Sequence, residues 1–219
     1  MKVFLFLTVF TTIGVLSPRL FAQSSKIDLE AGEKAKTPGF KKAAKNLYMD
    51  VHHVGPGKLT IEAVAAAHAK DLATEKKYGV KLINYWVDEK NGTIMCLAQA
   101  TSPAGLVNTH KEAHGLLPDQ VYLVTEGQEV KMKGKNSLYL DIHELGEGKV
   151  NAKEVEEAHK KDLTVQKKYG VNLINYWVDE KNGTIMCLAQ APDSTALINT
   201  HKDAHGLVPV KVVKVKQGE

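Results

Sequence analysis

LINYWVDEKNGTIMCLAQA, at Leu82–Ala100, occurs again without a change at Leu173–Ala191, 91 residues further along the chain. The same offset relates the flanking residues without a gap, from 47–121 in the first copy to 138–212 in the second. The chain is therefore a tandem duplication. Each copy shows which residues the other one retains and which it varies.

The duplicated stretch predicts a β-hairpin, because two strand-like runs flank an Asn-Gly pair that is typical of a tight turn. Alternation of apolar and polar residues predicts a strand before the first helix, and a Gly ends each helical pattern. In the first copy we expect strands over 47–54, 82–87, 93–100 and 121–124, with helices over 60–79 and 102–114. This βαββαβ order is that of a ferredoxin-like domain, with both helices on one face of the sheet.

Each copy leaves one face of its sheet uncovered, and such a face is normally buried against a second sheet. We therefore predict an α+β chain of two ferredoxin-like domains, packed as an intrachain pseudo-dimer with sheet face to sheet face. Further oligomerisation is left open by the sequence.

The N-terminus has the features of a secretory signal: Lys2, an apolar run over 3–16, and a cleavage site after Ala22. We expect an exported protein, periplasmic or secreted, without stable membrane insertion after cleavage; an uncleaved anchor is the alternative. The predicted organisation is a signal peptide over 1–22, a flexible tether over 23–45, a first repeat over 46–125, a linker over 126–136 and a second repeat over 137–216.

Composition excludes several classes of function. The net charge is only +4, and the lysines are scattered rather than interleaved with aromatic residues, so we expect no nucleic-acid partner. No Ser or Cys follows a nucleophile pattern, and no phosphate-binding Gly loop is present. Cys96 and Cys187 occupy equivalent strand positions, which favours two buried thiols.

The two copies retain an unusual set of polar residues while neighbouring helix positions change, as in Ala65 and Glu156. Histidines four residues apart on a helix can clamp a transition metal, and Asp-x-His places a carboxylate and an imidazole on one strand face. The topology brings the end of the first strand near the end of the second helix. The candidate ligands are Asp50, His52, His68, His110 and His114, with Asp141, His143, His159, His201 and His205 in the second copy.

Two geometries are open for this set. If Asp50 and His52 point toward the helices, they line a buried pocket with His68 and His110. If they point away, they lie at the edge of the interface between the copies, with His114 as the nearer companion. The apolar side of the strand favours the second geometry for a lone domain, but a sheet buried on both sides cannot decide between them.

Structural roles compete with ligation. A histidine on an apolar helix stripe, such as His68, is often a core residue bonded to a backbone carbonyl. A helix C-terminus favours imidazolium, which is the competing role for His110 and His114. Asp71 and its twin Asp162 are also retained, and we expect them on a solvated or salt-bridged helix face.

Four motifs of each copy resemble the DUF4242 family of small ferredoxin-like proteins, some of which are described as nickel-binding. In the first copy they are YMDVHH, AHAKDL, KYGVKLINYWVDEKNGTIMCLAQA and HKEAHGLLPDQVYLV. The resemblance covers nearly all of both copies and implies a dimer-forming domain that binds a divalent metal, without an established catalytic activity. The ten candidate ligands above match the family's motif positions. An export signal and two fused copies are departures from the family.

The sequence leaves three alternative functions to be tested. We favour an exported divalent-metal-binding protein that sequesters or handles the ion. Imidazole and carboxylate donors without thiolate suit nickel, zinc, copper or cobalt, and softness alone cannot choose among them. The resemblance to the family implies nickel. A second reading is a small-molecule-binding domain, or an enzyme without a large cofactor that uses one His or Asp as a base. A third is a structural or interaction module whose histidines only pack.

Overall fold

The computed structural model describes residues 44–127 and 129–219. The predicted signal peptide over 1–22, and the tether up to residue 43, lie outside the described residues. Among the described residues, no helix combines the length and the apolar character that crossing a membrane requires.

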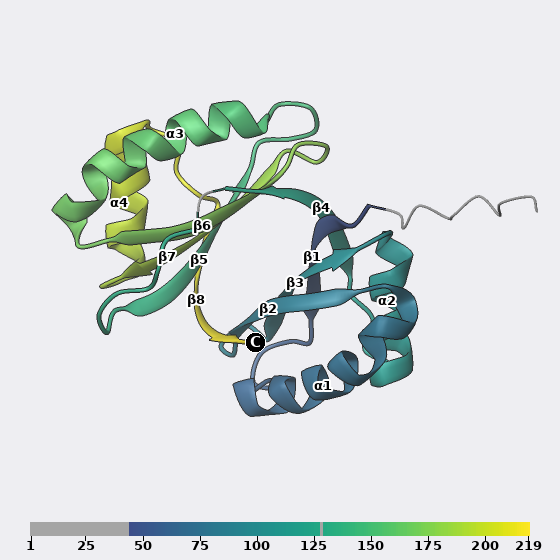
Figure 1. Cartoon of the computed structure of the whole chain (residues 1–219). Helices are drawn as coiled ribbons and strands as arrows, with labels where there is room; N and C mark the ends of the chain where they lie inside the picture. Colours follow the sequence, from purple (N-terminus) through teal and green to yellow (C-terminus); the bar gives the residue numbers. More distant parts are fainter. Residues whose placement is uncertain (1–43, 128) are drawn as a thin grey trace, which may run out of the picture. The chain divides into compact units, whose positions relative to one another are not determined.

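Both copies fold in the expected βαββαβ order, and each has a short 3-10 helix after its first α-helix (Figure 1). The first copy consists of β1 (Asn46–His53), α1 (Ile61–Thr74), η1 (Glu75–Tyr78), β2 (Lys81–Asp88), β3 (Thr93–Ala100), α2 (Pro103–Ala113) and β4 (Gln120–Glu126). The second consists of β5 (Ser137–Glu144), α3 (Ala152–Val165), η2 (Gln166–Tyr169), β6 (Asn172–Asp179), β7 (Thr184–Ala191), α4 (Ser194–Ala204) and β8 (Lys211–Gly218).

Local sequence sets the boundaries of these elements. The Thr60 hydroxyl accepts a hydrogen bond from the Ala63 N–H at 3.2 Å and caps α1. In the hairpin, the Asp88 side chain accepts the Asn91 N–H at 3.1 Å. Gly92 has a φ of 69°, and a Cβ there would lie 1.9 Å from the carbonyl oxygen of Gly55. Only glycine fits this turn, because it packs directly on the loop that leads to α1.

The eight strands form one closed barrel in the order β1-β3-β2-β8-β5-β7-β6-β4. The two sheets join edge to edge, because β8 pairs with β2 and β4 pairs with β6. Helices α1 and α2 cover one side of the barrel, and α3 and α4 cover the opposite side (Figure 1). The predicted α+β pseudo-dimer is confirmed. In addition to packing face to face, the two sheets pair along their edges.

The barrel interior holds the main apolar core, to which both copies contribute. Met49 and Val51 point inward from β1, and the Trp86 and Trp177 rings pack across the centre with centroids 4.9 Å apart. The opposite face of β1 points toward the helices, where Tyr48 packs in a second apolar layer. Each sheet is therefore buried on both faces, and the helix-facing side of β1 carries the site.

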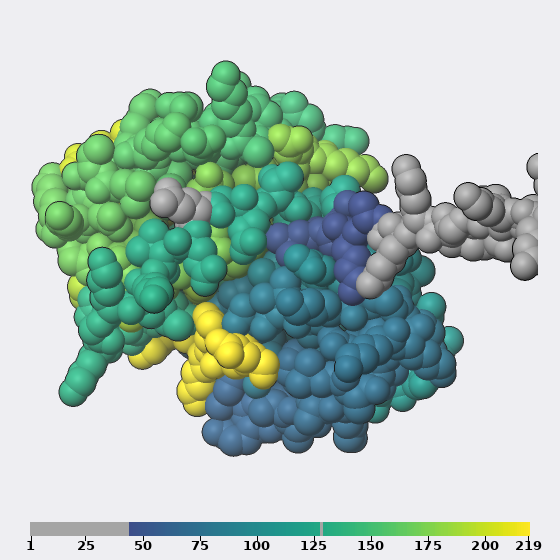
Figure 2. Space-filling view, viewed as in Figure 1, coloured from purple at the N-terminus to yellow at the C-terminus, as the bar shows by residue number. Residues whose placement is uncertain are grey.

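Closure of the barrel depends on glycines that lie over tyrosine rings. The Gly127 N–H donates to the Tyr176 carbonyl at 2.9 Å, and a Cβ at position 127 would lie 2.2 Å from that tyrosine ring. Gly218, the equivalent residue, lies on Tyr85 in the same way, with 2.1 Å for the added Cβ. Figure 2 shows the C-terminal end, in yellow, against the first copy. The last strand of each copy thus extends over a tyrosine of the other copy.

Replacing Gly127 with valine should therefore destabilise the chain by about 1–3 kcal/mol, the usual cost of forcing atoms into a packed space. Urea unfolding of Gly127→Val and of the exposed control Glu129→Val would measure this. We expect the control to stay within about 0.5 kcal/mol of the parent. Equal stability of the two variants would contradict the packing described for Gly127.

Candidate metal centre

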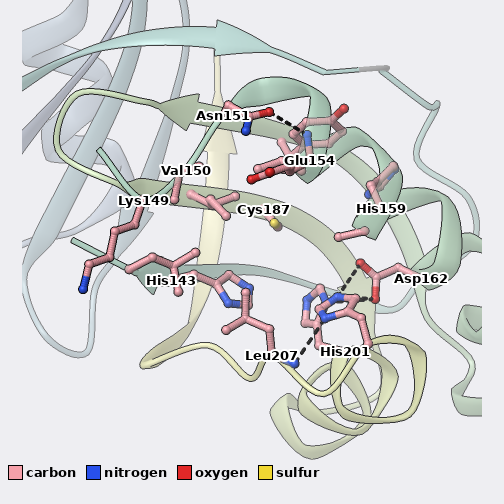
Figure 3. Close-up of a pocket in the computed structure, with 16 residues that line it drawn as sticks. His143, Lys149, Val150, Asn151, Glu154, His159, Asp162, Cys187, His201 and Leu207 are labelled. Carbon is pink, nitrogen blue, oxygen red and sulfur yellow. Dashed lines mark hydrogen bonds and ion pairs between the residues drawn. The ribbon is translucent and has the colours of Figure 1, made fainter. Parts of the chain in front are cut away.

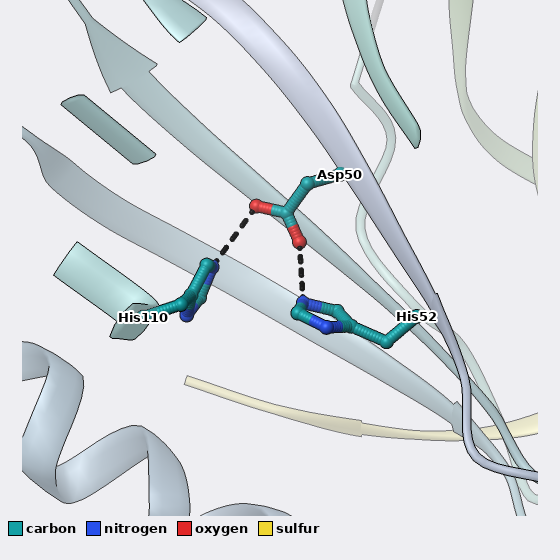
Figure 4. Close-up of side chains that lie close together, drawn as sticks. All are labelled: Asp50, His52 and His110. Carbon is teal, nitrogen blue, oxygen red and sulfur yellow. Dashed lines mark hydrogen bonds and ion pairs between the residues drawn. The ribbon is translucent and has the colours of Figure 1, made fainter. Parts of the chain in front are cut away.

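One aspartate on β1 contacts two histidines from different elements. His52 Nε2 lies 3.0 Å from Asp50 Oδ1, and His110 Nε2 of α2 lies 3.3 Å from Asp50 Oδ2 (Figure 4). Their exposed fractions are 0% for Asp50 and 2% for each histidine. Both oxygens of a fully buried carboxylate thus face imidazole nitrogens.

A second aspartate, from α1, extends this cluster. Asp71 Oδ1 lies 3.0 Å from His110 Nδ1, and Asp71 Oδ2 lies 3.1 Å from His114 Nε2. His110 is therefore held on both ring nitrogens, each by a carboxylate. The result is one continuous chain from β1 through α2 to α1, in the order His52, Asp50, His110, Asp71, His114.

The second copy reproduces this chain of contacts. His143 Nε2 lies 3.1 Å from Asp141 Oδ1, and His201 Nε2 lies 3.3 Å from Asp141 Oδ2. Asp162 Oδ1 lies 3.1 Å from His201 Nδ1 and 3.2 Å from His205 Nε2. Residues on the outer faces of the helices differ between the copies, whereas the contacts within the cluster are the same. The retained residues therefore form one unit.

Charge and burial act in opposite directions at the central histidine. Burial alone lowers the pKa of His110, but the hydrogen bonds and charges of Asp50 and Asp71 outweigh it and raise the pKa to about 10. His201 also reaches a pKa of about 10, for the same reasons. Burial raises the pKa of Asp50, yet its histidine partners give a net lowering. The cluster without metal is a buried imidazolium between two carboxylates.

The structure adopts the first of the two geometries considered above, not the second that the apolar side of the strand favours for a lone domain. Asp50 and His52 face the helices, because Met49 and Val51 are needed in the barrel interior. The expectation for Asp71 is wrong in one respect: it forms salt bridges, but with 3% exposure it is buried beneath the helices. The sequence offered one signal for this burial: an aspartate is retained at this position in both copies, three residues after His68 on the same helix.

His68 lies beside this cluster and outside its hydrogen-bonded chain. It packs on Tyr85 with ring centroids 4.7 Å apart, and burial lowers its pKa. Its Nε2 atom has no hydrogen-bond partner among the described residues, so the expected backbone carbonyl is not found on that nitrogen. His159 packs on Tyr176 at the same distance. Tyr85 and Tyr176 are also the tyrosines that Gly218 and Gly127 cover, so barrel closure is connected to the histidines beside both clusters.

The two cysteines are buried, as predicted, and they lie close to the aspartates of the cluster. Cys96 is paired with Asp50 across β1 and β3. Burial, and then the negative charges of Asp50 and Asp71, raise the pKa of the Cys96 thiol well above its usual value. Cys187 is affected in the same way. In the absence of a metal, both thiols are therefore protonated at neutral pH.

The donor atoms meet the chemical requirements of a transition-metal site. Asp50, His52 and His110 each offer one atom, all within 4.8 Å of one another, and so do Asp71, His110 and His114. A histidine that binds a metal through one ring nitrogen usually donates a hydrogen bond to a carboxylate from the other, and His110 makes such a contact with Asp71. His52 Nδ1 has no partner among the described residues. The residues therefore fit a divalent ion held by nitrogen and oxygen.

The model of one protein family matches both copies, at residues 48–124 and 139–215, and its description is "Nickel responsive protein SCO4226-like". The chain belongs to the SCO4226-like family. This agrees with the resemblance to nickel-binding ferredoxin-like proteins, and it places two domains of the family in tandem. Among curated proteins, no match was found.

Solved structures include SCO4226 itself, from Streptomyces coelicolor A3(2), at 29% identity over 35% of this chain and 91% of that one, with a TM-score of 0.33. A chlorite dismutase from Candidatus Nitrospira defluvii matches at 7% identity, 81% and 92% coverage, and a TM-score of 0.47. A heme-binding protein from Thermus thermophilus matches at 9% identity, 80% and 92% coverage, and a TM-score of 0.41. The family match is the finding that bears on the function of this chain.

The raised pKa of His110 and His201 predicts how stability depends on pH. Their stabilising contribution is fully present below pH 6.5, the usual value, and is lost as pH rises through about 10. Urea unfolding in the presence of a chelator, between pH 7 and 10, should show a falling free energy of unfolding.

The double variant His110→Asn with His201→Asn should show a much smaller fall over the same range. A parent protein whose stability rises with pH in this range, or a double variant with an unchanged slope, would contradict the assignment of these two histidines.

Proposed function

We propose that this chain is an exported nickel-type metal-binding protein that sequesters or handles the ion. The observation that carries the proposal is the buried Asp50, His52 and His110 set, repeated as Asp141, His143 and His201 in a chain of the SCO4226-like family. Each copy is expected to hold one ion.

In the proposed site, Asp50 supplies a carboxylate oxygen, and His52 and His110 each supply Nε2. An ion there would stabilise negative charge on Asp50 that is otherwise offset by the proton on His110. His110 must release that proton to offer a nitrogen, so binding is expected to release protons. Asp71 keeps its contact with His110 Nδ1 and fixes the orientation of the ring.

The donor set supports the choice of metal class. Nitrogen and carboxylate oxygen suit nickel, zinc, cobalt and copper(II), whereas a soft ion such as copper(I) favours thiolates. The raised pKa of the neighbouring Cys96 and Cys187 thiols disfavours the thiolate form that a soft ion needs. The nickel-responsive family favours nickel within the class.

Calorimetric titration of the chain with nickel tests the proposal directly. Replacing His110 and His201 together with alanine should abolish binding, because each is the central donor of its copy. His53→Ala is the matched control, since His53 is an exposed histidine next to the cluster whose twin is Glu144. Absence of binding to the parent chain, or equal binding by the double variant, would rule the proposal out.

Asp71 of α1 and Asp162 of α3 should increase the affinity for nickel without being essential for binding. Asp71→Asn with Asp162→Asn keeps the shape of each side chain but weakens the hold on the imidazole, so nickel affinity should fall roughly 10- to 100-fold. Competition with a chelator of known affinity would measure the change. An unchanged affinity would show that these aspartates do not orient the ligands.

Export is supported by the basic start, the apolar run and the Ala22 cleavage pattern. If the chain is exported from a bacterial host, mass spectrometry of the secreted or periplasmic protein should show an N-terminus at Gln23. Full-length protein retained in the cytoplasm would contradict this part of the proposal.

A further inference from the structure

A cavity of about 210 Å³ lies next to the cluster in the second copy, between α3 and the sheet (Figure 3). Most of its wall is apolar, and the apolar lining includes Val150, Val155, Ile185 and Leu207. One end reaches the histidines of the cluster, including His143. The cavity therefore combines an apolar body with a polar end, the usual design of a small-molecule site.

The polar end presents an unused hydrogen-bonding group. His143 is 3% exposed, and its Nδ1 atom has no hydrogen-bond partner among the described residues. Its other nitrogen, Nε2, lies 3.1 Å from Asp141 Oδ1. A buried polar atom without a partner is destabilising, so a ligand that supplies the missing hydrogen bond is favoured.

A hydroxyl group suits this nitrogen in either state of the cluster. When Nδ1 carries no hydrogen, it accepts a hydrogen bond from the ligand's O–H. With Nε2 bound to an ion, Nδ1 carries the hydrogen and donates to the hydroxyl oxygen. A carboxylate or an ammonium group would satisfy only one of the two states.

The volume limits the size of the apolar part. A dry apolar cavity of ~150 Å³ binds benzene. The cavity here is somewhat larger, at about 210 Å³, so a single aromatic ring with a hydroxyl and one small substituent fits.

We propose that the second copy binds a monocyclic phenol, with the ring against Val155, Ile185 and Leu207 and the hydroxyl bonded to His143 Nδ1. This site shares His143 with the proposed metal centre, but binding of the phenol does not depend on nickel. It makes specific the small-molecule reading that the sequence leaves open.

Titration with p-cresol and with toluene, followed by calorimetry and by NMR, tests the proposal in the metal-free chain. We expect saturable binding of p-cresol, and binding of toluene that is about tenfold weaker, because one hydrogen bond is missing. Ala158 lines the cavity, so Ala158→Phe should fill it and abolish p-cresol binding. The twin variant in the first copy, Ala67→Phe, is the matched control and should retain binding.

Nickel titration of the same variants separates this proposal from the metal site, because Ala158→Phe leaves every proposed ligand in place. Should that variant fail to fold, Leu207→Trp fills the cavity from the loop after α4. The proposal is overturned if p-cresol does not bind the parent chain, if toluene binds equally well, or if a folded cavity-filling variant retains p-cresol binding.

Discussion

A single imidazole between two buried carboxylates is the interaction on which the rest of each site depends. His110 joins Asp50 of β1 to Asp71 of α1, and His201 does the same for Asp141 and Asp162. Removing one partner of such a buried pair typically costs about 3–5 kcal/mol, because the charge left behind is uncompensated. The cluster therefore fixes both helices to the sheet while it assembles the donors of the proposed metal site.

The closed barrel explains why the site lies where it does. Both copies fill the barrel interior with apolar side chains, and the buried polar residues of β1 and β5 lie between sheet and helices. The last strand of each copy also covers a tyrosine of the other copy, and this tyrosine packs on a histidine beside the cluster, His68 or His159. Each cluster is thus formed by residues of its own copy, while the other copy packs on the tyrosine that neighbours it.

The sequence predicts most of the fold, because the duplicated hairpin and the capped helices are local signals. Its retained Asp-x-His and His-x3-His pairs also predict four of the five residues in the cluster chain. The direction of Asp50 and His52 could not be predicted, since alternation defines two faces and closure of the barrel buries both. Asp71 was misplaced because its burial depends on how α1 packs against α2. The cavity beside His143 depends on packing alone. The role of the cluster as a ligand set stays a prediction.

The central claim is that the buried cluster around His110 and His201 binds the metal. Anomalous diffraction from crystals of the nickel-loaded chain, measured on both sides of the nickel absorption edge, tests it most directly. The account predicts one peak in each copy, surrounded by Asp50, His52 and His110 and by their twins, without a cysteine sulfur in the shell. Nickel found only at exposed residues such as His53, with the cluster unchanged, would contradict it.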